Sequence, residues 1–398
     1  MKRRKAIWIT LIASAAAVCL VVTTLVFLGF FGSEDDTHFE QDETRVVVVD
    51  TTGSSLELYK AGTDLDTAVR FQPYDGAPIW LPRGDYFLVS HRSQRTAIYP
   101  VNILGYRGGP EKDGGLAITV RGYPATEPPV IPDGSGFAFV PSGYFLMGDR
   151  LNPNEPHYVW TQAFFIAQFE VSNAEFAAFL TSDDGYQNDV NWSESGKVWK
   201  RDNPSRTSAA LRENDPEFAR FGQPDMPVTG VTWFEAIAYC KWITAKYGGK
   251  RWLFSLPSEA EWEKAARGPD GFDYPLGRAI SDAETSVYNW KKNPSAERTV
   301  FGIEESRSKY RPNRYGIYHL GGNVVEWTQS VYRPFTRLRP YSEDDDRNQE
   351  TLRGARVARG GSWYSASTAL LYIPYRDAFE PEISHHDLGF RIVTRALP

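Results

Sequence analysis

The chain has 398 residues, of which 41% are hydrophobic and 24% charged, and a chain of this length allows two or three domains. The formal net charge of −6 argues against a nucleic-acid partner, which would require a basic face to neutralise phosphates. Twelve Trp and 21 Tyr, together with 33 Gly and 26 Pro, favour a loop-rich fold over a helical bundle. Only two cysteines occur, so no disulfide framework is available.

The amino-terminal segment has the pattern of a membrane anchor. Residues 2–5 are basic, and residues 6–33 contain no charged residue. About 20 apolar residues suffice to cross the hydrocarbon layer, so we expect a cytoplasmic tail at 1–5 and one transmembrane helix at 6–33. Basic residues before the span and acidic residues after it predict a cell-membrane protein with most of its chain outside the cytoplasm. A cleaved signal peptide is the alternative, although its apolar core is usually shorter, about 7–15 residues.

Short alternating strands follow an acidic tether at residues 34–43. Apolar and polar residues alternate in several runs between residues 44 and 123, with Gly, Pro and Asp between them. This pattern predicts a small antiparallel β-sandwich at 44–123. The turn at residues 81–86 (Leu-Pro-Arg-Gly-Asp-Tyr) resembles the turn of PEGA-like domains, and no catalytic grouping lies nearby. Residues 124–136 are rich in proline and predict a linker to a large domain at 137–398.

Two capping boxes predict helices in the large domain. Ser172 with Glu175 predicts a helix from Asn173 to about Leu180, and Ser258 with Glu261 predicts a second short helix. A longer helix over residues 234–247 places Cys240 on a buried apolar face.

The large domain contains a series of short motifs in a recognisable order. They lie at 139–148, 170–173, 227–233, 256–268, 274–277, 315–318, Gly-Asn-Val-Val-Glu-Trp at 322–327, Arg-Gly-Gly-Ser-Trp at 359–363 and Leu-Gly-Phe-Arg at 388–391. With these motifs the domain resembles the formylglycine-generating enzyme (sulfatase-modifying factor) family over nearly all of residues 137–395. The resemblance implies an α+β, C-type-lectin-like fold.

Oxidase members of that family convert a sulfatase cysteine to formylglycine with two cysteines that bind copper(I). Soft thiolates select copper(I), and copper activates dioxygen. The corresponding positions here are Ser365 and Leu370, and Cys240 is the only thiol in the domain. We therefore expect no copper and no oxidase activity, which makes the domain a pseudoenzyme in that sense.

The resemblance also implies structural calcium. At a first site the backbone carbonyls of Gly322 and Val324 and the carboxylate of Glu326 match the family's ligands, but His319 replaces an oxygen ligand. A second site maps to Asn289 and Trp290 without its later acidic ligand. Calcium is thus an open expectation, and a hydrogen-bonded buried carboxylate is the alternative role of Glu326.

The segment before Gly-Phe-Arg is the candidate binding cleft. It is rich in aromatic, hydroxyl and histidine side chains, and Arg391 at its end is expected to form a structural ion pair, whereas Arg376 could hold a carboxylate. The candidate residues are Trp363, Ser365, Leu370, Tyr375, Arg376, His385 and His386.

Three functions fit this cleft. The first is a non-oxidase binding or accessory protein, with an unknown extracytoplasmic protein or a small molecule as its ligand. The second is a divergent enzyme with formylglycine-generating or other oxidoreductase chemistry. The third is a ligand-binding variable protein of a diversity-generating retroelement.

Overall fold

The computed structural model describes residues 43–397 apart from 74, 93, 105–114, 153–154, 205–217, 281–299, 337–338, 343 and 345. The expected cytoplasmic tail, transmembrane helix and nearly all of the tether lie outside these residues. Among the residues that are described, no helix combines the length and the apolar character that crossing a membrane requires.

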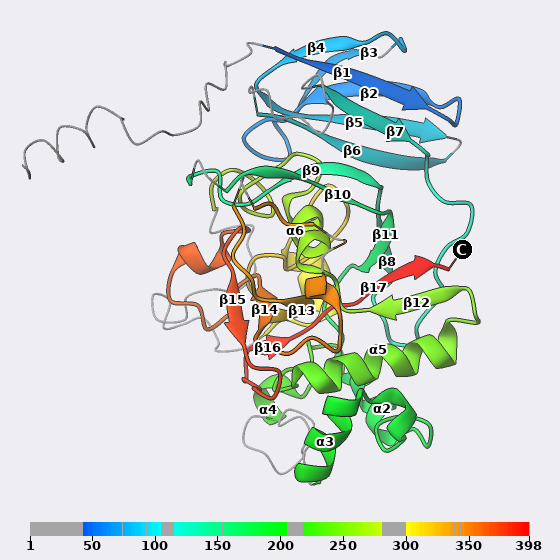
Figure 1. Ribbon diagram of the computed structural model, residues 1–398, viewed down its shortest axis with the longest axis vertical. Helices are drawn as coiled ribbons and strands as arrows, with labels where there is room; N and C mark the ends of the chain where they lie inside the picture. Colours follow the sequence, from blue (N-terminus) through cyan, green and yellow to red (C-terminus); the bar gives the residue numbers. More distant parts are fainter. Residues whose placement is uncertain are drawn as a thin grey trace, which may run out of the picture. The chain divides into compact units, whose positions relative to one another are not determined.

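Residues 43–120 form two facing sheets around one core (Figure 1). The strand orders are β4-β1-β7 and β3-β2-β5-β6, and Val46, Leu88 and Tyr99 are among the buried residues between them. The expectation of a purely antiparallel sandwich was wrong, because β1 pairs with β7 in parallel. The strands are β1 (Glu43–Asp50), β2 (Ser55–Lys60), β3 (Val69–Pro73), β4 (Ile79–Pro82), β5 (Gly84–Arg92), β6 (Arg95–Ile103) and β7 (Leu116–Val120).

The large domain is α+β, as the resemblance implied. Within its described residues, two four-stranded sheets with orders β12-β17-β11-β8 and β15-β14-β13-β16 stand beside the β9–β10 hairpin. The strands are β8 (Phe137–Val140), β9 (Gly143–Met147), β10 (His157–Thr161), β11 (Phe164–Ala167), β12 (Trp252–Ser255), β13 (Val325–Val331), β14 (Arg356–Arg359), β15 (Asp377–Phe379), β16 (Leu388–Gly389) and β17 (Val393–Ala396).

Short helices connect these sheets, and α5 lies beside β12 (Figure 1). Both predicted capping boxes are confirmed, at the starts of α2 and α6, and Thr232 with Glu235 forms a third at the start of α5. Cys240 is buried on α5, as expected. The helices are α2 (Asn173–Thr181), η1 (Asp189–Asn191), α3 (Glu194–Asp202), α4 (Phe218–Phe221), α5 (Trp233–Tyr247), α6 (Glu259–Arg267), α7 (Ile303–Lys309), η3 (Asp346–Asn348) and η4 (Thr368–Leu371).

A buried ionic cluster joins the sandwich to the large domain. Asp85 on β5 accepts hydrogen bonds from Arg150 (2.6 and 2.8 Å) and Arg278 (2.6 Å). Asn102 on β6 donates to the same carboxylate at 2.7 Å, and its own Oδ1 accepts from the Leu146 amide. Burial acts to raise the pKa of Asp85, but the two guanidinium groups outweigh it and hold the pKa below its ordinary value. The sandwich is therefore packed on the large domain through charge pairs that neither part could satisfy alone.

Candidate functional site

The Gly-Gly-Ser turn and the segment before Gly-Phe-Arg enclose a cleft of about 190 Å³. Its walls come from the end of β14, from η4, from β15 and from the loop before β16. The lining residues are Val325, Ala358, Arg359, Gly361, Ser362, Tyr364, Ser365, Leu370, Tyr375, Asp377, Phe379, His385, Asp387 and Leu388.

The turn at Gly361 is fixed by steric and hydrogen-bonding constraints. Gly361 has φ +64°, and a Cβ there would lie 2.6 Å from the carbonyl oxygen of Leu370, so only glycine fits. The Ser362 hydroxyl donates to Asp387 Oδ2 at 2.6 Å, and the Ser365 hydroxyl accepts from the Ser362 amide at 2.9 Å. These contacts hold the two sides of the cleft together.

Four of the predicted residues share the cleft: Ser365, Leu370, Tyr375 and His385. Ser365 and Leu370, which stand at the copper-ligand positions, thus face one cavity although neither side chain offers a thiolate. Burial and then the Asp377 carboxylate raise the pKa of Tyr375, so its phenol stays protonated at neutral pH and can donate a hydrogen bond.

The other three predicted residues lie outside the lining. Trp363 is 2% exposed and packs against Phe221, and its indole nitrogen has no hydrogen-bond partner among the described residues. His386 is exposed and contacts the rings of Trp363 and Tyr364 beside the cleft. Arg376 does not face the cleft, because its guanidinium pairs with Glu259 of α6. Its Nε and Nη2 donate to the two oxygens of that carboxylate and are not free for a ligand.

Two carboxylates in the cleft escaped the sequence reasoning. Asp377 begins β15, a three-residue strand too short to predict, and Asp387 was not among the candidate residues. Within the described part of the chain, no group of three or more His, Cys, Asp or Glu side chains could hold a metal ion. The signal that was present in the sequence is the position of Asp387 directly before Leu-Gly-Phe-Arg.

The polar groups of the cleft do not form a nucleophilic triad. His385 Nδ1 lies 3.5 Å from Asp387 Oδ1, while the Ser362 hydroxyl donates to the other oxygen of the same carboxylate. A triad requires the histidine between the serine and the carboxylate, so that it can accept the serine proton. Here the carboxylate lies between them, and the arrangement orients side chains without activating a serine.

Copper chemistry does not fit these residues. The cleft offers hydroxyl, carboxylate, phenol and imidazole groups, whereas copper(I) selects soft thiolates. Cys240 is 2% exposed on α5 and does not line the cleft, and burial raises the pKa of its thiol far above the ordinary value. Within the described residues, no thiolate is therefore placed to replace the missing pair.

The first calcium site does not fit either. Arg391 donates to both oxygens of Glu326 at 2.6 and 2.7 Å, and Trp262 Nε1 donates at 2.8 Å. Both partners of this ion pair are fully buried, so the guanidinium already supplies the positive charge that calcium would bring. His319 pairs instead with Glu170, at 3.2 Å. Gly322, Val324 and Glu326 thus do not offer calcium a free carboxylate; Asn289 and Trp290 lie outside the described residues.

The loop-rich α+β fold and the cleft behind the Gly-Gly-Ser turn define a formylglycine-generating-enzyme-like protein without the thiolate pair. Residues 125–396 match the family described as "Sulfatase-modifying factor enzyme 1-like domain". The chain therefore belongs to the sulfatase-modifying factor family, as the sequence motifs predicted.

Relatives of different activity match the same region. The formylglycine-generating enzyme of Streptomyces coelicolor is 31% identical over 296 residues, which cover 65% of this chain and 88% of that protein. The mouse "Inactive C-alpha-formylglycine-generating enzyme 2" is 28% identical over a region that covers 65% of this chain and 85% of that protein. "Serine/threonine-protein kinase pkn1" of Chlamydia caviae is 28% identical, and this chain spans only 37% of its length.

Solved structures are similar at lower identity. "Treponema denticola variable protein 1" is 22% identical, covers 65% of this chain and 94% of its own, and has a TM-score of 0.46. PvdO from Pseudomonas aeruginosa is 18% identical, covers 68% of this chain and 99% of its own, and has a TM-score of 0.47.

Proposed function

We propose that this chain is a non-oxidase member of the sulfatase-modifying factor family whose cleft binds a ligand. The observation that carries this proposal is the placement of Ser365 and Leu370 in one cavity at the positions of the copper thiolates. A hydroxyl that is already bonded to a turn amide and an aliphatic side chain can contact a ligand but cannot hold copper(I). A relative that is named inactive supports the same interpretation.

The cleft favours a ligand that carries both an apolar group and hydrogen-bond donors. Leu370 and Phe379 supply apolar wall, while the carboxylates of Asp377 and Asp387 accept hydrogen bonds. A loop of an extracytoplasmic protein and a small molecule both satisfy this chemistry.

Membrane anchoring is part of the proposal. It rests on the uncharged run at residues 6–33 and on the change from basic to acidic residues across it. Extraction of membranes with alkaline carbonate would test it: the full chain should stay in the pellet, and a variant lacking residues 1–33 should be released.

The copper test separates the binding protein from a divergent oxidase. The purified chain is titrated with copper(I) against a chelator and then incubated with a cysteine peptide and dioxygen, with the Streptomyces coelicolor enzyme as the positive control. We expect no tight copper(I) binding and no aldehyde product by mass spectrometry. Aldehyde formation above the level of a heat-denatured sample would establish the divergent enzyme instead.

A further inference from the structure

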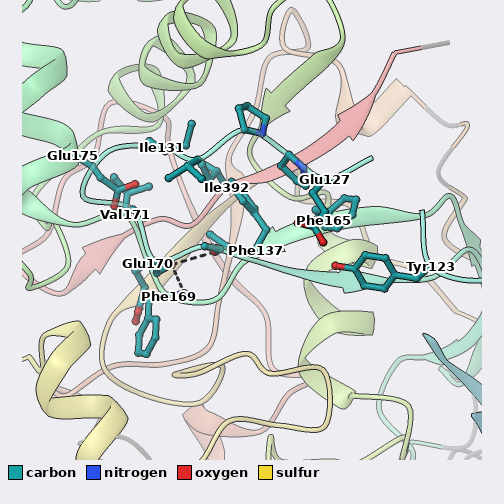
Figure 2. Close-up of a pocket in the computed structure, with 17 residues that line it drawn as sticks. Tyr123, Glu127, Ile131, Phe137, Phe165, Phe169, Glu170, Val171, Glu175 and Ile392 are labelled. Carbon is teal, nitrogen blue, oxygen red and sulfur yellow. Dashed lines mark hydrogen bonds between the residues drawn. The ribbon is translucent and has the colours of Figure 1, made fainter. Parts of the chain in front are cut away.

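A second cavity, of about 380 Å³, lies beneath the Pro-rich linker and away from the cleft residues. Figure 2 shows Glu175 at one end of this linker cavity and Tyr123 at the other, with Phe137 and Phe165 between them. None of its described lining residues is Lys, Arg or His. They are Tyr123, Glu127, Pro128, Pro129, Val130, Ile131, Gly134, Ser135, Gly136, Phe137, Phe165, Ala167, Phe169, Glu170, Val171, Glu175 and Ile392.

The described residues contain three capping boxes, and they differ in whether the second oxygen of the capping glutamate has a hydrogen-bond partner. In each box, one carboxylate oxygen accepts the backbone N–H of the N-cap residue. The other oxygen of Glu235 accepts from the Tyr186 hydroxyl at 3.0 Å, and that of Glu261 is paired with Arg395. The corresponding Oε1 of Glu175 accepts no hydrogen bond from the described residues.

This unpartnered oxygen belongs to a side chain that is only 6% exposed and that lines the linker cavity. A Cβ placed on Gly134 of the linker would lie 3.0 Å from it, so the glycine leaves the space beside Oε1 open. The Tyr239 hydroxyl is a nearby donor and lowers the pKa of this carboxyl, but among the described residues it makes no hydrogen bond of normal geometry. A donor from a ligand in the cavity would give this oxygen a hydrogen bond that the described residues do not provide.

The surroundings of Glu175 carry negative charge. Burial raises its pKa to about 7, and the Asp133 carboxylate adds to the effect, whereas the bonds from Ser172 lower it. Glu170, the other buried acid of the cavity, is bonded to His319 and Asn323, and His319 together with Arg391 keeps its pKa below the ordinary value despite burial. Glu127 at the far end is already paired with Arg95 at 3.0 Å.

Apolar and aromatic surface makes up the remaining wall. Phe137, Phe165 and Ile392 line the middle of the cavity, and proline rings of the linker cover it. The electron-rich face of an aromatic ring attracts a cation, and the same surface excludes water from an apolar ligand.

We propose that the linker cavity binds a small organic ammonium ion, with its N–H group on Glu175 Oε1 and its apolar body against Phe137 and Phe165. The alternative is that Glu175 serves only the capping box. That alternative leaves the difference between this box and the other two unexplained, and it predicts no preference for a charged ligand.

The experiment uses the full chain in a mild detergent and follows binding of benzylammonium by ligand-observed NMR, with benzyl alcohol as the uncharged analogue. At pH 8 we expect saturable binding of the cation at least about tenfold tighter than of the alcohol. Glu175→Gln keeps a capping acceptor but removes the charge. It should weaken binding of the cation about tenfold and leave the affinity for the alcohol unchanged. The affinity for the cation should also fall between pH 8 and pH 6, as Glu175 becomes protonated.

Glu235→Gln is the matched control, because it makes the same change in a box whose oxygens are both bonded inside the protein; the cation should bind this variant as it binds the wild type. Gly134→Ala gives independent evidence if Glu175→Gln fails to fold. Its methyl group would block access to Glu175 Oε1 and should weaken binding of the cation to a similar extent. Equal binding of cation and alcohol, absence of saturable cation binding, or unchanged affinity in both Glu175→Gln and Gly134→Ala would overturn the proposal.

Discussion

The buried carboxyl of Glu175 makes a specific prediction about stability and pH. Its pKa in the folded protein is raised from the ordinary 4.5 to about 7, chiefly by burial. The raised pKa means that the folded state favours the protonated form. The stabilisation is thus complete below about pH 4.5 and is lost as the pH rises through about 7. Glu175→Gln removes this titration but retains an oxygen for the Ser172 amide.

The magnitude follows from the interval between the two pKa values. Roughly 2.5 pH units at about 1.4 kcal/mol each give up to ~3.5 kcal/mol for ionising Glu175 in the folded state. The amide group of the glutamine adds a cost that does not depend on pH. Other acids with shifted pKa values, such as Asp270 and Glu326, are present in both proteins, so their contributions cancel in the difference.

Urea unfolding of both proteins at several pH values between 5 and 8.5 measures the effect. Relative to the wild type, the variant should gain about 2–3 kcal/mol of unfolding free energy between pH 5 and pH 8. If the difference in unfolding free energy between variant and wild type stays constant across this range, Glu175 is ionised throughout in the folded protein. That result would refute the inference that burial raises its pKa.

Three further predictions concern the frame and the cleft. Asp85→Asn leaves Arg150 and Arg278 without their carboxylate, so we expect a loss of about 2–4 kcal/mol in urea unfolding and faster proteolysis at the linker. Arg391→Met should cost about 3–5 kcal/mol in the same assay, because it leaves fully buried Glu326 unpaired; a loss under 1 kcal/mol would contradict the role of this pair. Ser365→Cys combined with Leu370→Cys should bind copper(I) in chelator competition, whereas each single variant should not.

The sequence was sufficient for features that depend on neighbouring residues. Short strand-like runs between residues 44 and 123 predicted a sandwich there, and the spacing of Ser172 and Glu175 located the start of α2. The structural ion pair of Arg391 was also expected and is confirmed, although its partner was not known. These features are encoded within a few residues, where periodicity and capping act directly.

The remaining features depend on contacts between distant residues. Arg376 looked available for a ligand because Glu259, which binds it, lies 117 residues earlier in the chain. Glu175 looked like an ordinary capping residue because its open oxygen is defined by the linker that passes over it. No local pattern reports which donor reaches a buried carboxylate, so the sequence could suggest the residues of a site but not their partners.

The cleft could lose its copper thiolates without losing its shape, because other contacts hold its frame. Arg359, directly before the Gly-Gly turn, is fully buried and pairs with Glu263 of α6, and it also donates to the carbonyl groups of Pro374 and Tyr375. The Ser365 hydroxyl also accepts a hydrogen bond from the Ser362 amide of the turn. The turn is therefore anchored from behind by charge pairs and from within by a hydroxyl. Because most of these anchoring contacts do not involve residues 365 and 370, the frame is compatible with the non-oxidase role proposed above.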